Sequence, residues 1–446
     1  MKNNKRIGLA LSGGGYRAAA YHIGTLRALD KLGILKDVDV ISSVSGGSIL
    51  AAYYALHKDN YEEFEAGFIK RLQKGVVNSS FRYGILVLIV IFLIAATTSS
   101  LLYLMGVYSV ICVSAGLAVL LGLIVIVLLK SFKVLPISQK VSKQYDKVFF
   151  SEKTLGDLPD KPILNINATN IATQQIFSFS KNYMGEYGYM LSKDKSLFDA
   201  THYPIANAVM ASSCVPYGFT PITIGKEFIK GKMSDCRAKE MPMLIDGGVY
   251  DNQGAHKLTQ KKSKYHCDYI IVSDAGNSII TAKGTKNIIT LAINTINMMM
   301  SRIKRIQRYE NLYQQRNDQE HFAYVPLEWN CKEDGLLGGF VRNLQAGNIH
   351  EDIYQAHGIS DEEIKKLRSE DKDKHNEAFH VIMEKLVTSI GWDTLSKKTP
   401  SIKQVEIARS VDTNLTALKT DKISALIAHS EWLAEVQVRM YLPMIC

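Results

Sequence analysis

Ser45 is the residue in this chain whose surroundings best suit nucleophilic chemistry. Residues 38–41, which are mostly apolar and β-branched, predict a buried strand, and the apolar, alanine-rich residues 49–56 predict a buried helix. Gly46 and Gly47 follow the serine, and glycine adopts backbone conformations that a side chain forbids. A serine on a tight turn between a strand and a helix is typical of a nucleophile elbow. Because serines and glycines also form ordinary turns, the rest of the chain must decide between the two interpretations.

A glycine-rich loop at residues 12–17, SGGGYR, is suited to holding an anion. It joins a predicted strand at residues 7–11 to a predicted helix at residues 18–32. Such a loop exposes successive backbone N–H groups, and the dipole of the following helix favours negative charge. The anion is either a bound phosphate or the oxyanion that forms when a serine attacks an ester, unless the loop is a plain turn. Because the loop lacks both the P-loop pattern and the third glycine of a dinucleotide fingerprint, the nucleotide interpretation is weakened.

Asp246 stands at the end of a third predicted element. Residues 243–246 predict a short strand, and Gly247 and Gly248 follow the aspartate directly. A strand that ends in an aspartate places a carboxylate at the edge of a sheet, where sites form in α/β folds. Asp-Gly is also the commonest signal for a β-hairpin turn, and that alternative is open from the residues alone.

Together these motifs suggest a division of labour in ester chemistry. Ser45 attacks the carbonyl carbon and Asp246 takes the serine proton, which requires the carboxylate to lie within about 2.6–3.2 Å of the hydroxyl. The oxyanion is held by backbone N–H groups of the glycine loop, those of Gly13, Gly14 and Gly15. The positions predicted to support this site are Arg17, Gly47, Gly247 and Gly248.

In these motifs and their order the chain resembles the patatin-like phospholipase family, especially its bacterial members. The resemblance rests on residues 12–17, residues 44–48 (VSGGS) and residues 246–252 (DGGVYDN), with a further similar segment at residues 211–221. It implies a three-layer α/β/α fold, hydrolysis of lipid acyl esters and a Ser45–Asp246 dyad without a histidine base, a metal or another cofactor. The chain departs from the family pattern at Ser43, which stands in place of the first glycine of the elbow.

A long uncharged segment interrupts this enzyme-like part. Residues 83–129 contain no Asp, Glu, Lys or Arg. One helix of that length would measure about 70 Å, so the segment fits two membrane passes of roughly 20 residues each, with a turn near residues 105–109. Arg82, Lys130 and Lys133 flank it, and by the positive-inside rule both ends face the cytoplasm, as at a bacterial inner membrane. The alternative is a buried hairpin within a soluble fold.

The chain therefore divides into four predicted parts. Residues 1–81 and 134–280 form the two parts of a patatin-like catalytic domain, residues 82–133 the transmembrane hairpin, and residues 281–446 a helical C-terminal region. Within the last part, residues 289–303 have apolar side chains at helical spacing among several basic ones. Such a helix lies either on an acidic membrane surface or, in the interpretation that we favour from the sequence, against the core with its basic side solvated.

The composition of the chain limits the classes of partner that it is expected to bind. The net charge of +10 favours an anionic partner, and beside a membrane hairpin acidic lipid is the simplest one. No nucleic-acid-binding motif is present, so no nucleic acid partner is expected. The six cysteines are scattered without a CxxC pair, which indicates neither a disulfide framework nor a zinc site. His22 is interpreted as a packing histidine and not as a third catalytic residue.

The resulting hypothesis is a membrane-anchored hydrolase of lipid acyl esters that acts on bilayer lipids at the cytoplasmic face. Its partners are the lipid substrate and, through residues 83–129, the bilayer itself; the sequence indicates no oligomeric state. Three alternatives remain open. They are an acyltransferase or thioesterase that uses the same serine, a signalling or defence effector whose lipase activity requires a ligand or partner, and a membrane scaffold with an inactive site.

Overall fold

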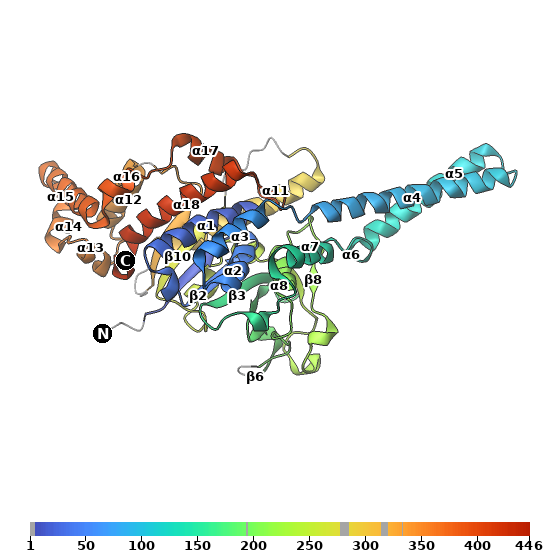
Figure 1. Cartoon of the computed structure of the whole chain (residues 1–446), viewed down its shortest axis with the longest axis horizontal. Helices are drawn as coiled ribbons and strands as arrows, with labels where there is room; N and C mark the ends of the chain where they lie inside the picture. Colours follow the sequence, from blue (N-terminus) through green and yellow to red (C-terminus); the bar gives the residue numbers. More distant parts are fainter. Residues whose placement is uncertain (1–4, 193–194, 277–284, 314–319, 332) are drawn as a thin grey trace.

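A β-sheet forms the centre of the computed structural model, which describes residues 5–192, 195–276, 285–313, 320–331 and 333–446. Within these residues the sheet has nine strands (Figure 1). Seven follow one another across it: β11 (His321–Pro326), β10 (Tyr269–Asp274), β1 (Ile7–Leu11), β2 (Val40–Val44), β3 (Ile163–Asn170), β4 (Gln175–Ser180) and β5 (Tyr183–Gly185). The strands from β11 to β3 are parallel, as buried strands joined by helices usually are.

Two further strands complete the sheet, and a small ribbon lies outside it. β9 (Met243–Asp246) pairs with β3 and with β8 (Ile222–Thr223), antiparallel in both cases. The separate ribbon consists of β6 (Met190–Ser192) and β7 (Lys195–Ser196). The predicted α/β class, with a central parallel sheet and surrounding helices, is thereby confirmed.

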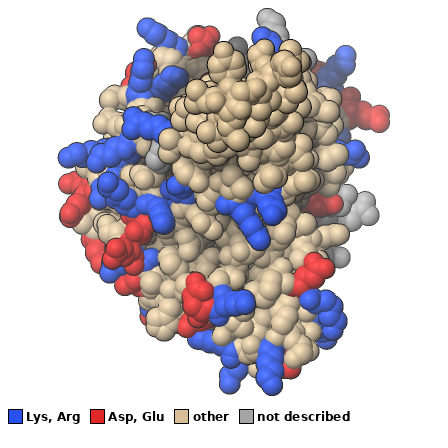
Figure 2. All heavy atoms as spheres, turned by 90° about the vertical axis from the view of Figure 1, so that its right-hand side faces the viewer, with Lys and Arg blue, Asp and Glu red and all other residues tan. Residues whose placement is uncertain are grey.

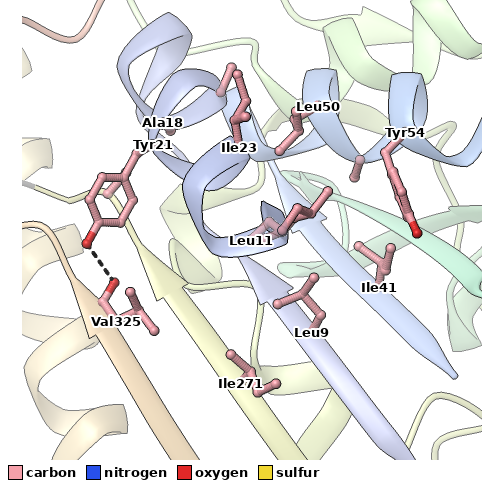
Figure 3. Packing of buried hydrophobic residues seen from close by; sticks show 14 of the residues in the cluster. Leu9, Leu11, Ala18, Tyr21, Ile23, Ile41, Leu50, Tyr54, Ile271 and Val325 are labelled. Atoms are coloured by element: carbon pink, nitrogen blue, oxygen red, sulfur yellow. Dashed lines mark hydrogen bonds between the residues drawn. The ribbon is translucent and has the colours of Figure 1, made fainter. Parts of the chain in front are cut away.

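The larger core lies between one face of the sheet and α1 (Gly15–Lys31), α2 (Gly46–His57) and α18 (Thr420–Tyr441). Successive strand residues point to opposite faces, so Leu9 and Leu11 of β1 join this core. In Figure 3 they lie beside residues of three neighbouring strands and beneath side chains of α1 and α2. Tyr21 of α1 reaches across to β11, where its hydroxyl donates to the Val325 carbonyl oxygen at 3.3 Å.

The opposite face of the sheet carries a second, smaller core. Ala10 and Ile270, which alternate with the residues of the larger core, pack there in a small cluster with Leu258 and Tyr265. These last two belong to α10 (His256–Thr259) and to the chain after it. The 26-residue α11 (Ile288–Tyr313) also reaches a residue of this cluster, since the Asn311 side-chain amide donates to the Tyr324 hydroxyl at 3.0 Å.

The remaining helices are described by their positions along the chain. Before the C-terminal part they are α3 (Tyr61–Leu72), α4 (Asn78–Leu104), α5 (Ser109–Leu129), α6 (Ser131–Val134), α7 (Ile137–Tyr145) with a π-helical turn (Asp146–Phe150), α8 (Ile205–Ser212) and α9 (Gly248–Asp251). After it begins they are α11 (Ile288–Tyr313), α12 (Glu333–Ala346), α13 (Glu351–Ala356), α14 (Asp361–Leu367), α15 (Lys372–Ile390), α16 (Trp392–Ser396) and α17 (Ile402–Ser410).

The region after residue 281 is largely helical, but it also contributes to the central sheet. Its strand β11 pairs with β10, and its helix α18 packs directly on α1. At the crossing of the two helices Gly24 faces α18, and the Ser430 hydroxyl donates to the Tyr21 carbonyl oxygen. The predicted helical C-terminal region thus differs from the structure in having a strand and in sharing the main core. The four predicted domain boundaries remain predictions.

The uncharged segment forms two long helices, α4 and α5, that project from the body (Figure 1). Both are long and apolar enough to cross a membrane, and most of their side chains are exposed in the protein itself. The alternative of a hairpin buried in a soluble core is therefore wrong. Small residues let the two helices meet closely, because Gly116 of α5 faces Ala95 and Ser99 of α4.

Helix α11 has two apolar faces, of which the sequence predicts one at residues 289–303. The predicted positions that the structure describes, Ile293, Ile296, Met300 and Ile303, are half-buried. On another face of the helix the apolar side chains of Ile288, Leu291, Met298 and Met299 are 54–81% exposed. Lys304 is buried, and its Nζ lies 3.2 Å from Asp274 Oδ2. Helical periodicity predicts the half-buried stripe but not the second apolar face, which the protein leaves uncovered.

We predict that Gly24→Ala destabilises the protein through the contact between α1 and α18. An added Cβ would collide with the Ser430 hydroxyl and with the Ile427 carbonyl oxygen, and the backbone cannot move aside cheaply. Overpacking of this kind lowers the free energy of unfolding by about 1–3 kcal/mol, measured by denaturant unfolding of the full chain in detergent.

Gly335→Ala in α12 is the matched control, since nothing lies within 4 Å of its added Cβ. It should show only the helix-propensity gain of about 1 kcal/mol. Equal changes in the free energy of unfolding of the two variants would contradict the close packing at Gly24.

Candidate active site

The turn after β2 holds Ser45 in a conformation that few non-glycine residues adopt. Its φ is 51° and its ψ is −120°, between the last strand residue and the first turn of α2. Gly46 and Gly47 are required there because an added Cβ would collide with the carbonyl oxygens of Gly15 and Leu11 respectively. The Gly47 amide also donates to the Ser12 carbonyl oxygen at 3.2 Å. The elbow and the glycine loop are therefore in direct backbone contact.

The register of the sheet brings Ser45 and Asp246 together. β2 and β9 pair with successive stretches of the same edge of β3. β2 is parallel to β3 and β9 is antiparallel to it, so the two strands run toward each other. Val44 of β2 is opposite Asn167, and Asp246 of β9 is opposite the next residue, Ala168. The residue that follows Val44 and the residue that ends β9 consequently meet, and the Ser45 side chain lies close enough to the Asp246 carboxylate to lower its pKa.

Burial changes the acidity of Asp246. The residue is only 3% exposed, and loss of hydration raises the pKa of its carboxyl group to about 7, although hydrogen bonds from the Gly248 amide and the Ser45 hydroxyl act in the opposite direction. The amide of Gly248 lies 2.7 Å from Oδ1. An aspartate in this state accepts a proton readily near neutral pH and is a carboxylate above it.

The two glycines after Asp246 begin a helix and not a hairpin. The Tyr250 amide donates to the Gly247 carbonyl oxygen in the first turn of α9. An added Cβ at Gly247 would collide with the Asn167 carbonyl oxygen, and one at Gly248 would lie 2.9 Å from Asp246 Oδ1. The hairpin interpretation of Asp-Gly is therefore wrong, and both glycines let the chain pass close to the carboxylate.

The glycine loop lies against the nucleophile, but its three amides are not equivalent. An added Cβ at Gly13 would lie 3.2 Å from the Ser45 Cβ. The Gly13 amide donates to the Asn252 carbonyl oxygen at 2.9 Å, so it differs from the prediction that it binds the oxyanion. Gly14 and Gly15 have positive φ values of 142° and 58°, and within the described residues their amides have no acceptor. These two amides remain the predicted oxyanion donors.

Arg17 fixes the segments around this loop, as predicted in outline. It is buried, its Nε donates to the Ala275 carbonyl oxygen and its Nη1 donates to the Val411 carbonyl oxygen, each at 3.1 Å. Burial lowers the pKa of its guanidinium to about 10, partly offset by Asp274 and Asp412. Arg17 thus ties α1 to the chain after β10 and to the C-terminal region.

Ser212 and Asn252 are two site residues whose roles the motifs alone do not reveal. The Ser212 hydroxyl accepts from the Ser45 amide at 2.8 Å and donates to the Asn167 carbonyl oxygen at 2.7 Å. It therefore holds the strained elbow against β3. Both residues lie in segments that resemble the family, which was the one available signal, but their partners depend on the tertiary fold.

His22 is a packing residue, in agreement with its interpretation from the sequence. Nε2 lies 3.0 Å from the Ser12 carbonyl oxygen, which can only accept, so Nε2 carries the proton. Nδ1 then accepts from the Ser273 hydroxyl at 2.7 Å. Burial lowers the pKa of His22 to about 4, so the ring is neutral at physiological pH. It supports the glycine loop from behind.

A buried serine and aspartate beside a glycine loop, on an α/β sheet, define the class of serine-dependent ester hydrolases. Comparison with known proteins identifies the family within that class. The family model described as "Patatin-like phospholipase" matches residues 9–258, more than half of the chain. The chain belongs to the patatin-like phospholipase family, which places it among the lipid ester hydrolases.

Individual relatives are distant. A lysophospholipase, NTE1 of Pyricularia oryzae, is 46% identical over 55 residues, which are 12% of this chain and 4% of that protein. Human GIVD cytosolic phospholipase A2 has a TM-score of 0.37 at 13% identity over 61% of this chain and 43% of its own. VipD from Legionella pneumophila has a TM-score of 0.30 at 13% identity over 97% and 92%. The chain thus spans only a small part of the curated relative, and the likeness to these structures is weak.

We predict that Asp246→Asn stabilises the protein at pH 8 but not at pH 4. The folded pKa of about 7 lies above the ordinary 3.8, so the folded state holds the proton more tightly than the unfolded state. The contribution of the Asp246 carboxyl group to the free energy of unfolding is fully present below pH 4 and is lost as the pH rises through 7. Asparagine does not ionise, so the variant should gain on the order of 2–4 kcal/mol over the parent across this range.

Denaturant unfolding at a series of pH values measures that difference. Asp393→Asn, which removes an exposed carboxylate, is the control and should show a difference that is small at every pH. A pH-independent difference for Asp246→Asn would contradict the raised pKa.

Proposed function

We propose that the protein is a membrane-anchored lipid acyl hydrolase in which Ser45 is the nucleophile and Asp246 the base. The observation that carries the proposal is the sheet register, which brings the strained Ser45 beside the buried Asp246. Asp246 takes the hydroxyl proton as the serine oxygen attacks the ester carbonyl carbon, and the amides of Gly14 and Gly15 stabilise the oxyanion. Asp246 then returns the proton to the departing alcohol.

The second half of the cycle uses the same groups. Water attacks the acyl–Ser45 ester, gives its proton to Asp246 and releases the fatty acid, and Asp246 returns the proton to the serine oxygen. A single base can serve both steps because its pKa of about 7 lies near the operating pH, where proton acceptance and donation are both efficient. His22 has no part in this cycle, since both of its ring nitrogens are occupied behind the glycine loop.

The surface on the hairpin side supports a position on a bilayer. Figure 2 shows this side, where the uncharged hairpin stands out and Lys and Arg side chains gather beside its base. The flanking Arg82, Lys130 and Lys133 favour a cytoplasmic location for both ends, and so for the catalytic domain, as at a bacterial inner membrane. Anchoring would hold the site at the surface of its substrate.

Helix α11 offers a second contact with the bilayer. It begins on the hairpin side of the molecule (Figure 1) and exposes apolar side chains at Ile288, Leu291, Met298 and Met299. The neighbouring Met300 extends inward, where its Cε would lie 2.7 Å from a Cβ at Gly248. The helix therefore stands between the dyad and the outside, with its apolar stripe free to enter the interface.

The central test is release of fatty acid from phospholipid vesicles by single and double variants of the dyad. Ser45→Ala and Asp246→Ala should each lower kcat by several decades, and the double variant should lose little more because the two groups act as a unit. Ser45→Ala should also abolish labelling by a fluorophosphonate, detected by intact-mass measurement.

Turnover unchanged in either single variant would reject the dyad. Analysis of products with an added alcohol acceptor distinguishes hydrolysis from acyl transfer. Ser424→Ala is the control: this exposed hydroxyl of α18 donates to the Asp421 carbonyl oxygen within its own helix, so its loss should leave turnover unchanged.

We further predict that Met298→Asp lowers turnover on vesicles at least tenfold while leaving hydrolysis of a dissolved short-chain ester within about twofold. The substitution places a charge on the exposed stripe of α11, where it would oppose entry into an apolar interface without touching the dyad. Initial rates on the two substrates measure the effect.

Ile402→Asp in α17 is the control, since Ile402 is 76% exposed on the C-terminal region. It should leave both rates unchanged. Equal loss on both substrates for Met298→Asp would contradict a surface role for α11.

A further inference from the structure

A cavity of about 480 Å³ with several basic residues in its lining lies at the base of the hairpin, apart from the Ser45 site. Its charged lining comes from the end of α3 and the chain after it, and from the π-helical turn after α7: Lys70, Arg71, Lys74 and Lys147. These segments are the ones that enter and leave the hairpin. The cavity is therefore built where the catalytic domain meets the proposed membrane surface.

The four cations are not neutralised by the protein. Among the residues that the structure describes, none of them has a carboxylate within ion-pair distance. Four like charges around one cavity repel one another, and an anion between them relieves that repulsion. The lining thus indicates an anionic ligand rather than a structural ion-pair network.

Arg71 is already held in place for such a ligand. Its Nε donates to the Val148 carbonyl oxygen at 2.8 Å and its Nη1 to the Gly67 carbonyl oxygen at 3.0 Å. Its guanidinium also lies over the Tyr53 ring, 4.9 Å from the centroid. A fixed planar guanidinium with N–H groups to spare, surrounded by flexible lysines, matches the oxygens of a phosphate better than those of a single carboxylate.

The position of the cavity relative to the apolar helices indicates that the phosphate belongs to a lipid. α4 begins at Asn78, and the apolar span starts at Arg82, about 6 Å further along at 1.5 Å per residue. Lys74 lies only a few residues before Asn78, so the cavity is within reach of the headgroup layer. Basic side chains at that level attract anionic lipid by roughly 1 kcal/mol each.

We propose that this cavity binds the phosphate group of an anionic membrane lipid as a site distinct from the catalytic one. The proposal rests on the membrane position of the hairpin and not on the Ser45–Asp246 dyad. Such a lipid would be held by Arg71 and the three lysines while its acyl chains run beside α4 and α5.

The test measures lipid binding by the full chain carrying Ser45→Ala, so that hydrolysis neither consumes the ligand nor affects the result. The protein in neutral detergent is titrated with dioctanoyl phosphatidylglycerol, dioctanoyl phosphatidylcholine and inorganic phosphate, and the shift of the thermal unfolding midpoint reports binding. The cavity variant is Lys70→Gln/Lys74→Gln/Lys147→Gln, whose three side chains are exposed. The control variant, Lys365→Gln/Lys397→Gln/Lys398→Gln, removes the same charge from exposed positions in the C-terminal region.

We expect phosphatidylglycerol to raise the midpoint, phosphatidylcholine to raise it much less, and the cavity variant to weaken phosphatidylglycerol binding at least tenfold while the control variant binds normally. Equal binding by the cavity and control variants would overturn the proposal. A response to inorganic phosphate as strong as the response to phosphatidylglycerol would overturn the assignment to lipid. Failure of the parent protein to release fatty acid, with phosphatidylglycerol binding intact, would contradict the proposed dyad but not this site.

Discussion

The structure depends on one arrangement of strands: β2 and β9 share an edge of β3 and approach each other from opposite directions. Val44 and Asp246 are opposite consecutive residues of β3, Asn167 and Ala168, so the chain leaving β2 must turn sharply beside the end of β9. The turn is made by Ser45 with a positive φ, and close approach of the neighbouring backbones excludes side chains at Gly46 and Gly47. The same arrangement keeps Asp246 away from water and raises its pKa to about 7. The strain at Ser45, the close packing of the two glycines and the raised pKa of Asp246 therefore have the same structural cause.

The C-terminal region and the base of the hairpin both contact the glycine loop. The Tyr16 amide, one residue after Gly15, donates to the Asn414 carbonyl oxygen at 2.8 Å, and the Tyr16 hydroxyl donates to the Lys74 carbonyl oxygen at 3.0 Å. The C-terminal region consequently completes the support of the loop rather than forming a separate unit. Lys74 in turn lines the basic cavity. Tyr16, which directly follows the predicted oxyanion donors, is therefore hydrogen-bonded to the part of the chain that we place at the membrane.

Much of the site could be predicted from local sequence, because each motif is a strand followed by a turn and is encoded within a few residues. The predicted roles of Ser45, Asp246 and the glycine loop were inferred in this way. The hydrogen bond from the Gly13 amide to the Asn252 carbonyl oxygen could not be predicted locally, because it depends on how α9 approaches the loop. The contact between Tyr16 and Asn414 joins segments far apart in the sequence, and the period of α11 does not reveal the second apolar face that the helix leaves exposed. The long-range contacts decide these details, and no local pattern encodes them.

The pH dependence of kcat/KM tests the central claim most directly, because it reports the ionisation of the essential base in the free enzyme. With a dissolved short-chain ester, the account predicts a rate that falls on the acid side with an apparent pKa of about 7, set by burial of Asp246. A rate constant that stays level down to pH 5 would show that the base is an ordinary exposed carboxylate or another group, and would contradict the assignment of Asp246.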